Sequence, residues 1–229
     1  MSRLSSTRGA AILCYVTDRR ILPLKDPRDA SEALLRSVEA VAAAGIDWIQ
    51  IRDKDLSGKD ATDLTNKALQ RAAKAAARAT PARILVNDRL DVALSERAGG
   101  VHLGEKSLPV VEARRLTVSR VPGQDFLIGV SCHSLEAAKA AEKDGADYIF
   151  YGPVFATPSK VAYGTPQGLD RLAEVCHSVS LPVLAIGGVT PENAASCLAA
   201  GAKGIAAIRL FQDAQDLEVL VRFLRKLSV

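Results

Sequence analysis

The feature that most constrains this chain is a regular alternation of short apolar runs with longer helix-forming segments. Eight apolar runs lie at 11–17, 46–51, 82–86, 100–103, 126–130, 148–151, 182–186 and 204–208. Continuous apolar runs of this length, bounded by turn residues, predict strands that are buried on both faces. Strands of that kind are typical of parallel sheets covered by helices.

Helical segments are expected between and after these runs, at 29–44, 57–79, 88–98, 109–118, 135–143, 169–177, 191–200 and 215–226. Ser134 and Thr190 are good N-cap residues, and Gly45 and Gly145 follow helix ends. Eight strands alternating with eight helices in 229 residues predict an α/β TIM (β/α)8 barrel in a single domain. A doubly wound open sheet shares the alternation, but it usually has fewer strands, and no GxGxxG follows the first strand here.

Residues 1–10 are expected to form a flexible tail, and 11–229 the single catalytic barrel domain. The net charge of +4 is spread along the chain, without a dense Lys/Arg run interleaved with aromatics. Nucleic-acid binding is therefore not favoured, whereas small anionic substrates suit the charge. Four cysteines without a CxxC pair predict reduced thiols in a cytoplasmic protein, and we expect neither a signal peptide nor a membrane span.

The stretch GPVFATPSK, residues 152–160, follows the sixth predicted strand. It carries two hydroxyls and a cation, from Thr157, Ser159 and Lys160. A polar loop of this kind at a strand end is suited to holding an anion. In a TIM barrel the carboxyl ends of all strands share one face, so the residues after the other strands should converge on this loop.

Two of these strand ends carry candidate ligands for a phosphorylated substrate and a metal. Gln50, Arg52 and Lys54 alternate after the second strand and predict an inward-facing cationic pair, although a solvated charge run is an equal alternative. Asn87 and Asp88 follow the third strand. Asp88 is a candidate Mg²⁺ ligand, and capping of the next helix is its alternative role.

Histidines follow the fourth and fifth strands. His102, taken alone, is more typical of a structural histidine, whereas His133 is a candidate general base or a residue that orders its turn. Cys132 precedes His133 directly, and adjacent residues on a strand point to opposite sides, so a catalytic thiol dyad is disfavoured. No GxSxG elbow is present, which argues against a serine hydrolase.

The last two strands end in Gly187-Gly188 and in Arg209. The loops after strands seven and eight form the usual phosphate site of this fold, and glycine lets backbone N–H groups approach an anion. The alternative is a tight turn in which glycine is needed only for space. Two cationic regions on one face imply two phosphorylated substrates, or one bisphosphorylated substrate.

Seven stretches in this order resemble the superfamily of thiamine-phosphate synthase and thiazole tautomerase: QIRDKD, VNDRLDVAL, GVHLGE, GVSCHS, DYIFYGPVFATPSK, LPVLAIGGVTPEN and AGAKGIAAI. The resemblance is closer to the synthase. It implies a transferase of thiamine biosynthesis that joins hydroxymethylpyrimidine diphosphate to thiazole phosphate and releases pyrophosphate onto Mg²⁺. It also implies small phosphorylated pyrimidine and thiazole partners, with no nucleic acid and no membrane; homo-oligomerisation stays open.

The resemblance also assigns residues to roles. The pyrimidine diphosphate would be held by Gln50, Arg52, Lys54, Asn87 and Ser131, and Mg²⁺ by Asp88. The thiazole phosphate and pyrophosphate would contact Thr157, Ser159 and Lys160. The thiazole phosphate site would be closed by Gly187, Gly188 and the backbone near Ile208 and Arg209. Catalytic roles would fall to Lys160, Ser131 and, for proton transfer, His133.

Two positions depart from the family pattern. Ser107 stands where synthases usually carry a second Mg²⁺-binding aspartate, and Arg209 where a serine is usual. Glu105 is close enough in sequence to be considered as a substitute ligand. The departures leave two alternatives open: a metal-independent thiazole tautomerase using His133, and a non-catalytic thiazole-phosphate-binding barrel. The presence of Lys54 and Asp88 favours the synthase.

Overall fold

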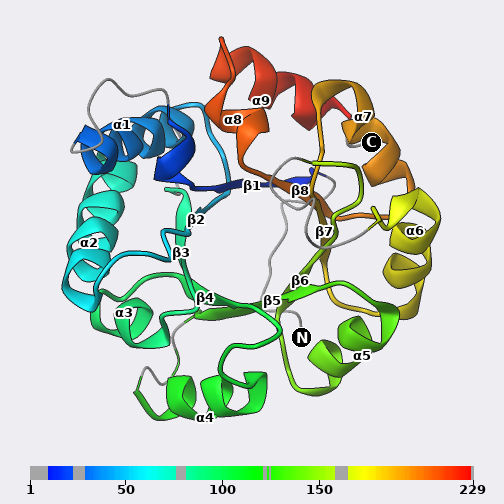
Figure 1. Cartoon of the computed structure of the whole chain (residues 1–229), viewed down its shortest axis with the longest axis horizontal. Helices are drawn as coiled ribbons and strands as arrows, with labels where there is room; N and C mark the ends of the chain where they lie inside the picture. Colours follow the sequence, from blue (N-terminus) through cyan, green and yellow to red (C-terminus); the bar gives the residue numbers. More distant parts are fainter. Residues whose placement is uncertain are drawn as a thin grey trace.

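The computed structural model describes residues 10–22, 29–75, 81–120, 123, 125–157 and 165–227. Within these residues, eight parallel strands pair in chain order, and β8 closes the barrel by pairing with β1 (Figure 1). The strands are β1 (Ile12–Val16), β2 (Trp48–Ile51), β3 (Arg83–Asn87), β4 (Gly100–Leu103), β5 (Leu127–Cys132), β6 (Tyr148–Tyr151), β7 (Val183–Ile186) and β8 (Gly204–Ala207). The predicted TIM barrel is confirmed.

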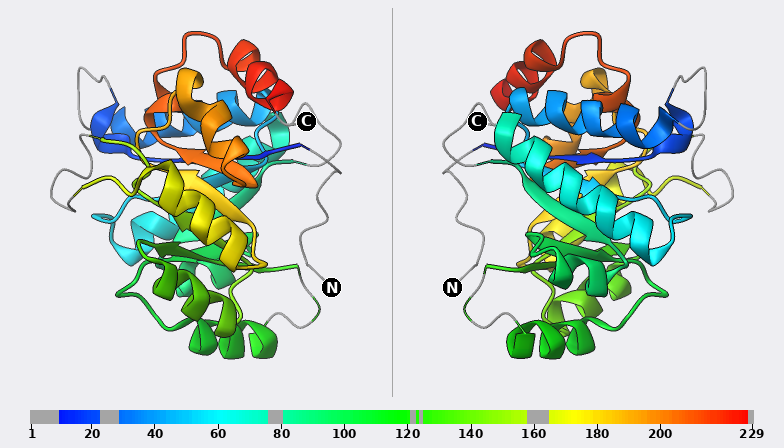
Figure 2. Two further views of the ribbon diagram at one scale, coloured as in Figure 1. Left: turned by 90° about the vertical axis from the view of Figure 1, so that its right-hand side faces the viewer. Right: turned by 90° about the vertical axis from the view of Figure 1, so that its left-hand side faces the viewer.

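Helices surround the barrel on its outside (Figures 1 and 2). They are α1 (Ala30–Ala43), α2 (Gly58–Ala75), α3 (Leu90–Ser95), α4 (Val110–Arg120), α5 (Leu135–Lys143), α6 (Gly168–Ser178), α7 (Pro191–Ala199), α8 (Arg209–Gln212) and α9 (Leu217–Lys226), with a 3₁₀ turn, η1 (Arg19–Ile21). The sequence did not predict α8 and η1, because one turn is too short to show apolar periodicity. No helix among the described residues is long and apolar enough to cross a membrane.

The barrel interior is a packed core of side chains from alternate strand positions. It contains Cys14, Val16, Trp48, Leu85, Leu127, Tyr148, Phe150, Leu184 and Ala206. Gly129 leaves room for one of them, because a Cβ there would lie 2.0 Å from the Tyr148 ring. A second, larger apolar cluster fills the space between the strands and the surrounding helices.

The amino ends of the strands are tied together by acidic residues that precede β2 and β6. Asp147 Oδ2 accepts the Ile128 N–H at 2.7 Å and lies 2.6 Å from Arg114 Nη2. Asp47 Oδ2 accepts the Leu13 N–H at 2.8 Å in the same way. These contacts stabilise the face opposite to the one that carries the predicted site.

Candidate active site

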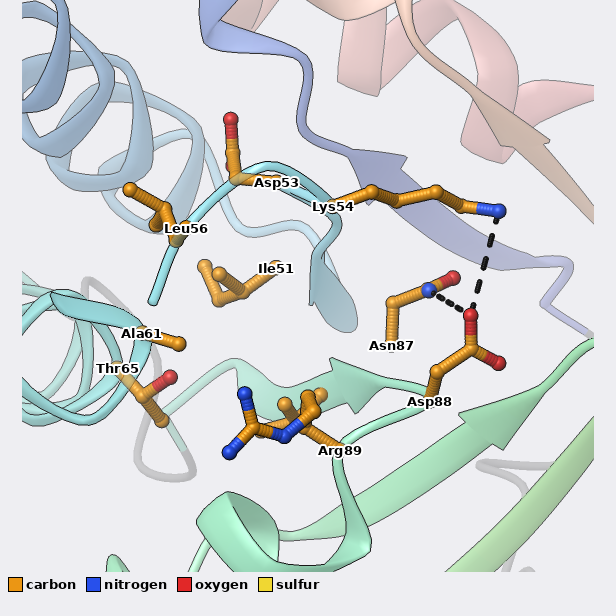
Figure 3. A pocket seen from close by; sticks show the side chains of 10 residues that line it. Ile51, Asp53, Lys54, Leu56, Ala61, Thr65, Asn87, Asp88 and Arg89 are labelled. Atoms are coloured by element: carbon orange, nitrogen blue, oxygen red, sulfur yellow. Dashed lines mark hydrogen bonds and ion pairs between the residues drawn. The ribbon is translucent and has the colours of Figure 1, made fainter. Parts of the chain in front are cut away.

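A continuous chain of polar side chains runs across the carboxyl ends of β2 and β3. Gln50 is 1% exposed, and its Nε2 donates to Asn87 Oδ1 at 2.9 Å. Asn87 Nδ2 in turn donates to Asp88 Oδ2 at 2.7 Å. Lys54 Nζ lies 4.0 Å from the same Asp88 oxygen, and Figure 3 shows the lysine reaching toward it. Four residues predicted to bind the diphosphate or its metal therefore lie together.

Lys54 reaches this position in a different way from the one expected. Strand β2 ends at Ile51, so alternation along a strand does not extend to Arg52 and Lys54. The chain turns after β2, and the turn aims Lys54 at Asp88. Arg52 is half-buried beside it. Lys54 is 56% exposed and pairs with Asp88 across two loops, so both the anion-binding role and the solvated charge run stay open.

Asp88 has an unusual backbone conformation, with φ of 59°. Few residues other than glycine occupy this left-handed region, although aspartate is among those that tolerate it. The carboxylate does not cap α3, whose N-cap is Arg89 with no side-chain hydrogen bond. Instead Asp88 Oδ1 accepts the Gly104 N–H at 3.1 Å and the Ser107 hydroxyl. The helix-cap alternative is therefore wrong.

The surroundings of Asp88 favour its charged form. Partial burial raises the pKa of the Asp88 carboxyl, but hydrogen bonds from Ser107 and Gly104 and the charge of Lys54 outweigh burial. Its pKa consequently lies below the ordinary value for aspartate. An ionised carboxylate beside a lysine is suited to hold a hard divalent cation next to a phosphate.

Ser107 faces Asp88 directly, so the departure from the family pattern falls inside the site. Its hydroxyl accepts the Gly104 N–H at 2.8 Å and donates to Asp88. Glu105 is exposed on the same loop. Among the described residues, no group of three or more His, Cys, Asp or Glu side chains is placed to hold a metal ion. Glu105 therefore does not complete such a cluster with Asp88.

A hollow of about 280 Å³ adjoins this polar chain. Its walls come from β2, β3 and α2, and its lining residues are Ile51, Asp53, Lys54, Leu56, Ala61, Thr65, Val86, Asn87, Asp88 and Arg89 (Figure 3). The Thr65 hydroxyl is buried and has no hydrogen-bond partner among the described residues. The hollow therefore has both apolar lining residues, such as Ile51 and Leu56, and charged ones, among them Lys54 and Asp88.

His102 is a structural histidine, as expected from the sequence alone. It is 2% exposed, and its Nδ1 lies 3.1 Å from the Tyr148 hydroxyl. Its Nε2 lies 2.9 Å from Ser131 Oγ, and its ring centroid is 4.1 Å from that of Phe150. These contacts orient the half-buried Ser131 on β5, a predicted substrate-binding residue.

The two residues that follow Ser131, Cys132 and His133, have different surroundings. Cys132 packs in the outer core, and burial, followed by the charge of Glu105, raises the pKa of its thiol to about 12. Such a thiol is not a nucleophile at neutral pH, as expected from its place beside His133 on a strand. His133 Nδ1 donates its proton to the Gly152 carbonyl, which orders the turn, and its role in proton transfer stays a prediction.

The glycines after β7 have a clear steric role. Gly187 and Gly188 have φ of 92° and 67°. A Cβ on Gly187 would lie 2.6 Å from Pro153, and one on Gly188 would lie 2.6 Å from the Ala156 carbonyl oxygen. The loop after β6 therefore packs closely against the loop after β7. The predicted binding of phosphate by Gly187 and Gly188 stays a prediction.

The end of β8 carries the short helix that the sequence did not predict. Ile208 is the N-cap of α8, and Arg209 begins it. A short extra helix after the last strand is where TIM barrels frequently hold phosphate. Arg209 is exposed and lies 3.6 Å from Asp213 along the helix. Thr157 is half-buried at the end of a described segment, while Ser159 and Lys160 lie outside the described residues.

Comparison of the sequence with known proteins identifies the family of this chain. A model of thiamine monophosphate synthase matches residues 21–211. The chain belongs to this family. It is 46% identical to thiamine-phosphate synthase of Methanoculleus marisnigri, over 80% of this chain and 82% of that protein. It is 38% identical to thiamine-phosphate synthase of Moorella thermoacetica, over 84% and 87%. The family resemblance drawn from the sequence is confirmed.

Solved structures give the same result. Thiamine phosphate pyrophosphorylase from Pyrococcus furiosus is similar with a TM-score of 0.77 and 33% identity, covering 95% of each chain. A 3-hexulose-6-phosphate synthase has a TM-score of 0.68 at 14% identity, covering 96% of this chain and 100% of that one. The similarity to the 3-hexulose-6-phosphate synthase shows only that the two proteins share a fold. Sequence relatives and the first structure both support a transferase of thiamine biosynthesis, the enzyme class expected from the sequence.

Proposed function

We propose that this barrel joins hydroxymethylpyrimidine diphosphate to thiazole phosphate, giving thiamine phosphate and pyrophosphate. The observation that carries the proposal is the chain from Gln50 through Asn87 and Asp88 to Lys54, in a member of the synthase family. It places amide groups beside an ionised carboxylate and a cation. These are groups suited to a pyrimidine ring and to its diphosphate.

In this mechanism the bond between the pyrimidine methylene carbon and the diphosphate oxygen breaks, and the thiazole nitrogen forms a new bond to that carbon. Charge develops on the departing pyrophosphate, so fixed cations lower the barrier. Arg52 and Lys54 supply such charge from the loop after β2, and Lys160 would add to it from the loop after β6. Gln50, Asn87 and Ser131 orient the pyrimidine.

Mg²⁺ is part of this proposal, with Asp88 as its protein ligand. The oxygen ligands available around Asp88 fit Mg²⁺, because this ion is commonly bound by one or two carboxylates together with substrate phosphate oxygens and water. Asp88 is ionised, and Ser107 supplies a neighbouring hydroxyl oxygen. When bound there, Mg²⁺ would neutralise charge on the diphosphate oxygens.

We place the thiazole phosphate at the other side of the barrel mouth. Thr157, Ser159, Gly187 and Gly188 would surround it from the loops after β6 and β7. Ile208 and Arg209 would close the site from α8, where the exposed guanidinium is free to turn from Asp213 toward a phosphate. A cytoplasmic location and assembly into homo-oligomers are further expectations.

The test is a two-substrate assay with the purified chain, saturating Mg²⁺ and detection of thiamine phosphate. We expect product with the natural chain, and at least a 100-fold lower rate with Lys54→Ala, about 2.7 kcal/mol of transition-state stabilisation. Lys203→Ala, on an exposed residue at the amino end of β8, is the matched control and should keep full activity. Absence of product together with interconversion of thiazole carboxylate phosphate isomers would instead establish the tautomerase.

A further inference from the structure

A buried ion-pair network ties the loop after β2 to the end of β1. The Asp53 side chain is 1% exposed. Its Oδ2 accepts the Thr17 hydroxyl proton at 2.9 Å, and its Oδ1 accepts the Arg19 backbone N–H at 3.2 Å. Arg19 Nη1 lies 2.9 Å from the same Oδ1. A buried carboxylate is stable only when it is paired and hydrogen-bonded, so Asp53 holds the two segments together.

The same network reaches the backbone of the predicted diphosphate-binding residues. Thr17 is fully buried, and its Oγ1 accepts the Arg52 N–H at 2.8 Å. The Thr17 N–H donates to the Gln50 carbonyl at 2.9 Å. One hydroxyl therefore joins the Arg52 backbone to the Asp53 carboxylate, and it sets the direction in which the chain leaves β2.

Arg19 also controls the charge around Lys54. Lys54 lies between Asp53 and Asp55 in the sequence, and Arg19 binds both carboxylates, reaching Asp55 through Nη1 and Nη2 at 2.8 Å each. Figure 3 shows Asp53 directed away from Asp88 and Lys54 directed toward it. Without Arg19, two unpaired carboxylates would flank Lys54 and repel an incoming anion.

We propose that Arg19, Asp53 and Thr17 are positioning residues for diphosphate binding. Their network presents Arg52 and Lys54 to the anion, and it neutralises the carboxylates on either side of Lys54. The inference rests on the proposed function, because the anion it concerns is the diphosphate of the pyrimidine substrate. It adds Thr17, directly after β1, and Arg19, in η1, which no sequence motif singled out.

The first experiment measures binding of Mg²⁺-pyrophosphate to the full chain by calorimetry, without turnover. Arg19→Met should weaken this binding about tenfold, as removal of outer-shell partners commonly does. Arg114→Met is the matched control, since Arg114 is also largely buried and pairs with Asp147 at the opposite end of the barrel. Both variants should lose thermal stability, but only Arg19→Met should lose affinity. Unchanged affinity of folded Arg19→Met would overturn the proposal.

A second pair of variants leaves every charge in place and decides the question if Arg19→Met does not fold. Thr17→Val removes the hydroxyl, and Thr17→Ser retains it. Thr17→Val should raise the KM for the pyrimidine diphosphate about tenfold and leave the KM for thiazole phosphate unchanged, and Thr17→Ser should restore it. An equal rise in both KM values, or no rescue by serine, would indicate a merely structural role and refute positioning.

The two proposals can fail separately. If the natural chain forms no thiamine phosphate, the proposed function is wrong. Calorimetry with Mg²⁺-pyrophosphate on Arg19→Met and on the Thr17 pair still measures the positioning role, because it requires no turnover. Wild-type affinity in folded Arg19→Met, or in Thr17→Val if Arg19→Met does not fold, would then reject the positioning role as well.

Discussion

Replacement of Asp88 by asparagine separates the metal-binding role of this residue from its structural role. The two side chains have the same shape, and an asparagine oxygen can still accept the hydrogen bonds that Gly104 and Ser107 give to Oδ1. What is lost is the negative charge, together with the acceptor that Oδ2 offers to Asn87 Nδ2 at 2.7 Å. The variant therefore tests the charge of Asp88 with the loss of one hydrogen bond.

The cost in folding stability is small when worked from the ion pair with Lys54. At 4.0 Å two unit charges attract by about 1 kcal/mol in water and by about 4 kcal/mol at an effective dielectric constant of 20. Lys54 is 56% exposed and Asp88 34% exposed, so the lower value applies. We expect Asp88→Asn to lose about 1 kcal/mol of unfolding free energy or less from this ion pair, and about 1 kcal/mol more from the hydrogen bond that Asn87 gives to Oδ2.

The expected cost in catalysis is much larger, because a metal-binding carboxylate acts on charge that develops in the transition state. We predict a fall in kcat/KM of at least about 100-fold and a higher Mg²⁺ concentration at half-maximal rate. The assay is a titration of Mg²⁺ at fixed saturating substrates, with urea unfolding of the same preparations as the stability control. An unchanged Mg²⁺ midpoint in a folded Asp88→Asn protein would refute the assignment of Asp88 as the metal ligand.

Three further predictions concern stability. Thr65→Val removes a buried hydroxyl that has no partner among the described residues, so the variant should gain about 1 kcal/mol, or roughly 2–4 °C in Tm; a lower Tm in calorimetry would show that the hydroxyl is satisfied by solvent in the adjacent hollow. Gly129→Ala would place a Cβ 2.0 Å from the Tyr148 ring, and overpacking of this kind should destabilise the barrel by about 1–3 kcal/mol, measured by urea unfolding; wild-type stability would mean that the barrel interior relaxes easily. The folded-state pKa of Asp88 is lowered, so its contribution to stability is present above the unfolded value of about 3.9 and is lost as the pH falls through the folded value. The stability of Asp88→Asn should therefore differ from that of the natural chain at pH 6 and approach it as the pH falls through the lowered pKa of Asp88. A difference that stays constant with pH would contradict a lowered pKa in the folded state.

The barrel itself could be predicted because each of its strands is a continuous apolar run bounded by turn residues. For β4, α5 and β6 the expected bounds agree with the structure residue by residue. Other ends differ by a few residues, as at α3, which spans Leu90–Ser95 where 88–98 was expected. The first and last residues of a helix depend on tertiary contacts, which a local sequence pattern does not show.

The site was predicted less completely, for physical reasons that differ from residue to residue. Residue type and position at or just after the end of a strand were enough to single out Gln50, Lys54 and Asp88. The left-handed backbone of Asp88 and its contacts with Gly104 and Ser107 depend on a neighbouring loop. The hydrogen bond between Thr17 and Asp53 joins residues that are 36 positions apart in the sequence. No periodicity or motif predicts a contact between them.

We propose that the pyrimidine diphosphate binds at the ends of β2 and β3 and releases pyrophosphate only in the reaction that joins the pyrimidine carbon to the thiazole nitrogen. The most direct test is the stoichiometry of pyrophosphate and thiamine phosphate in one reaction mixture with both substrates and Mg²⁺. We predict one pyrophosphate for each thiamine phosphate, with both absent when the pyrimidine diphosphate is supplied without thiazole phosphate. Release of pyrophosphate without thiamine phosphate in the complete mixture, or formation of neither product, would contradict the account.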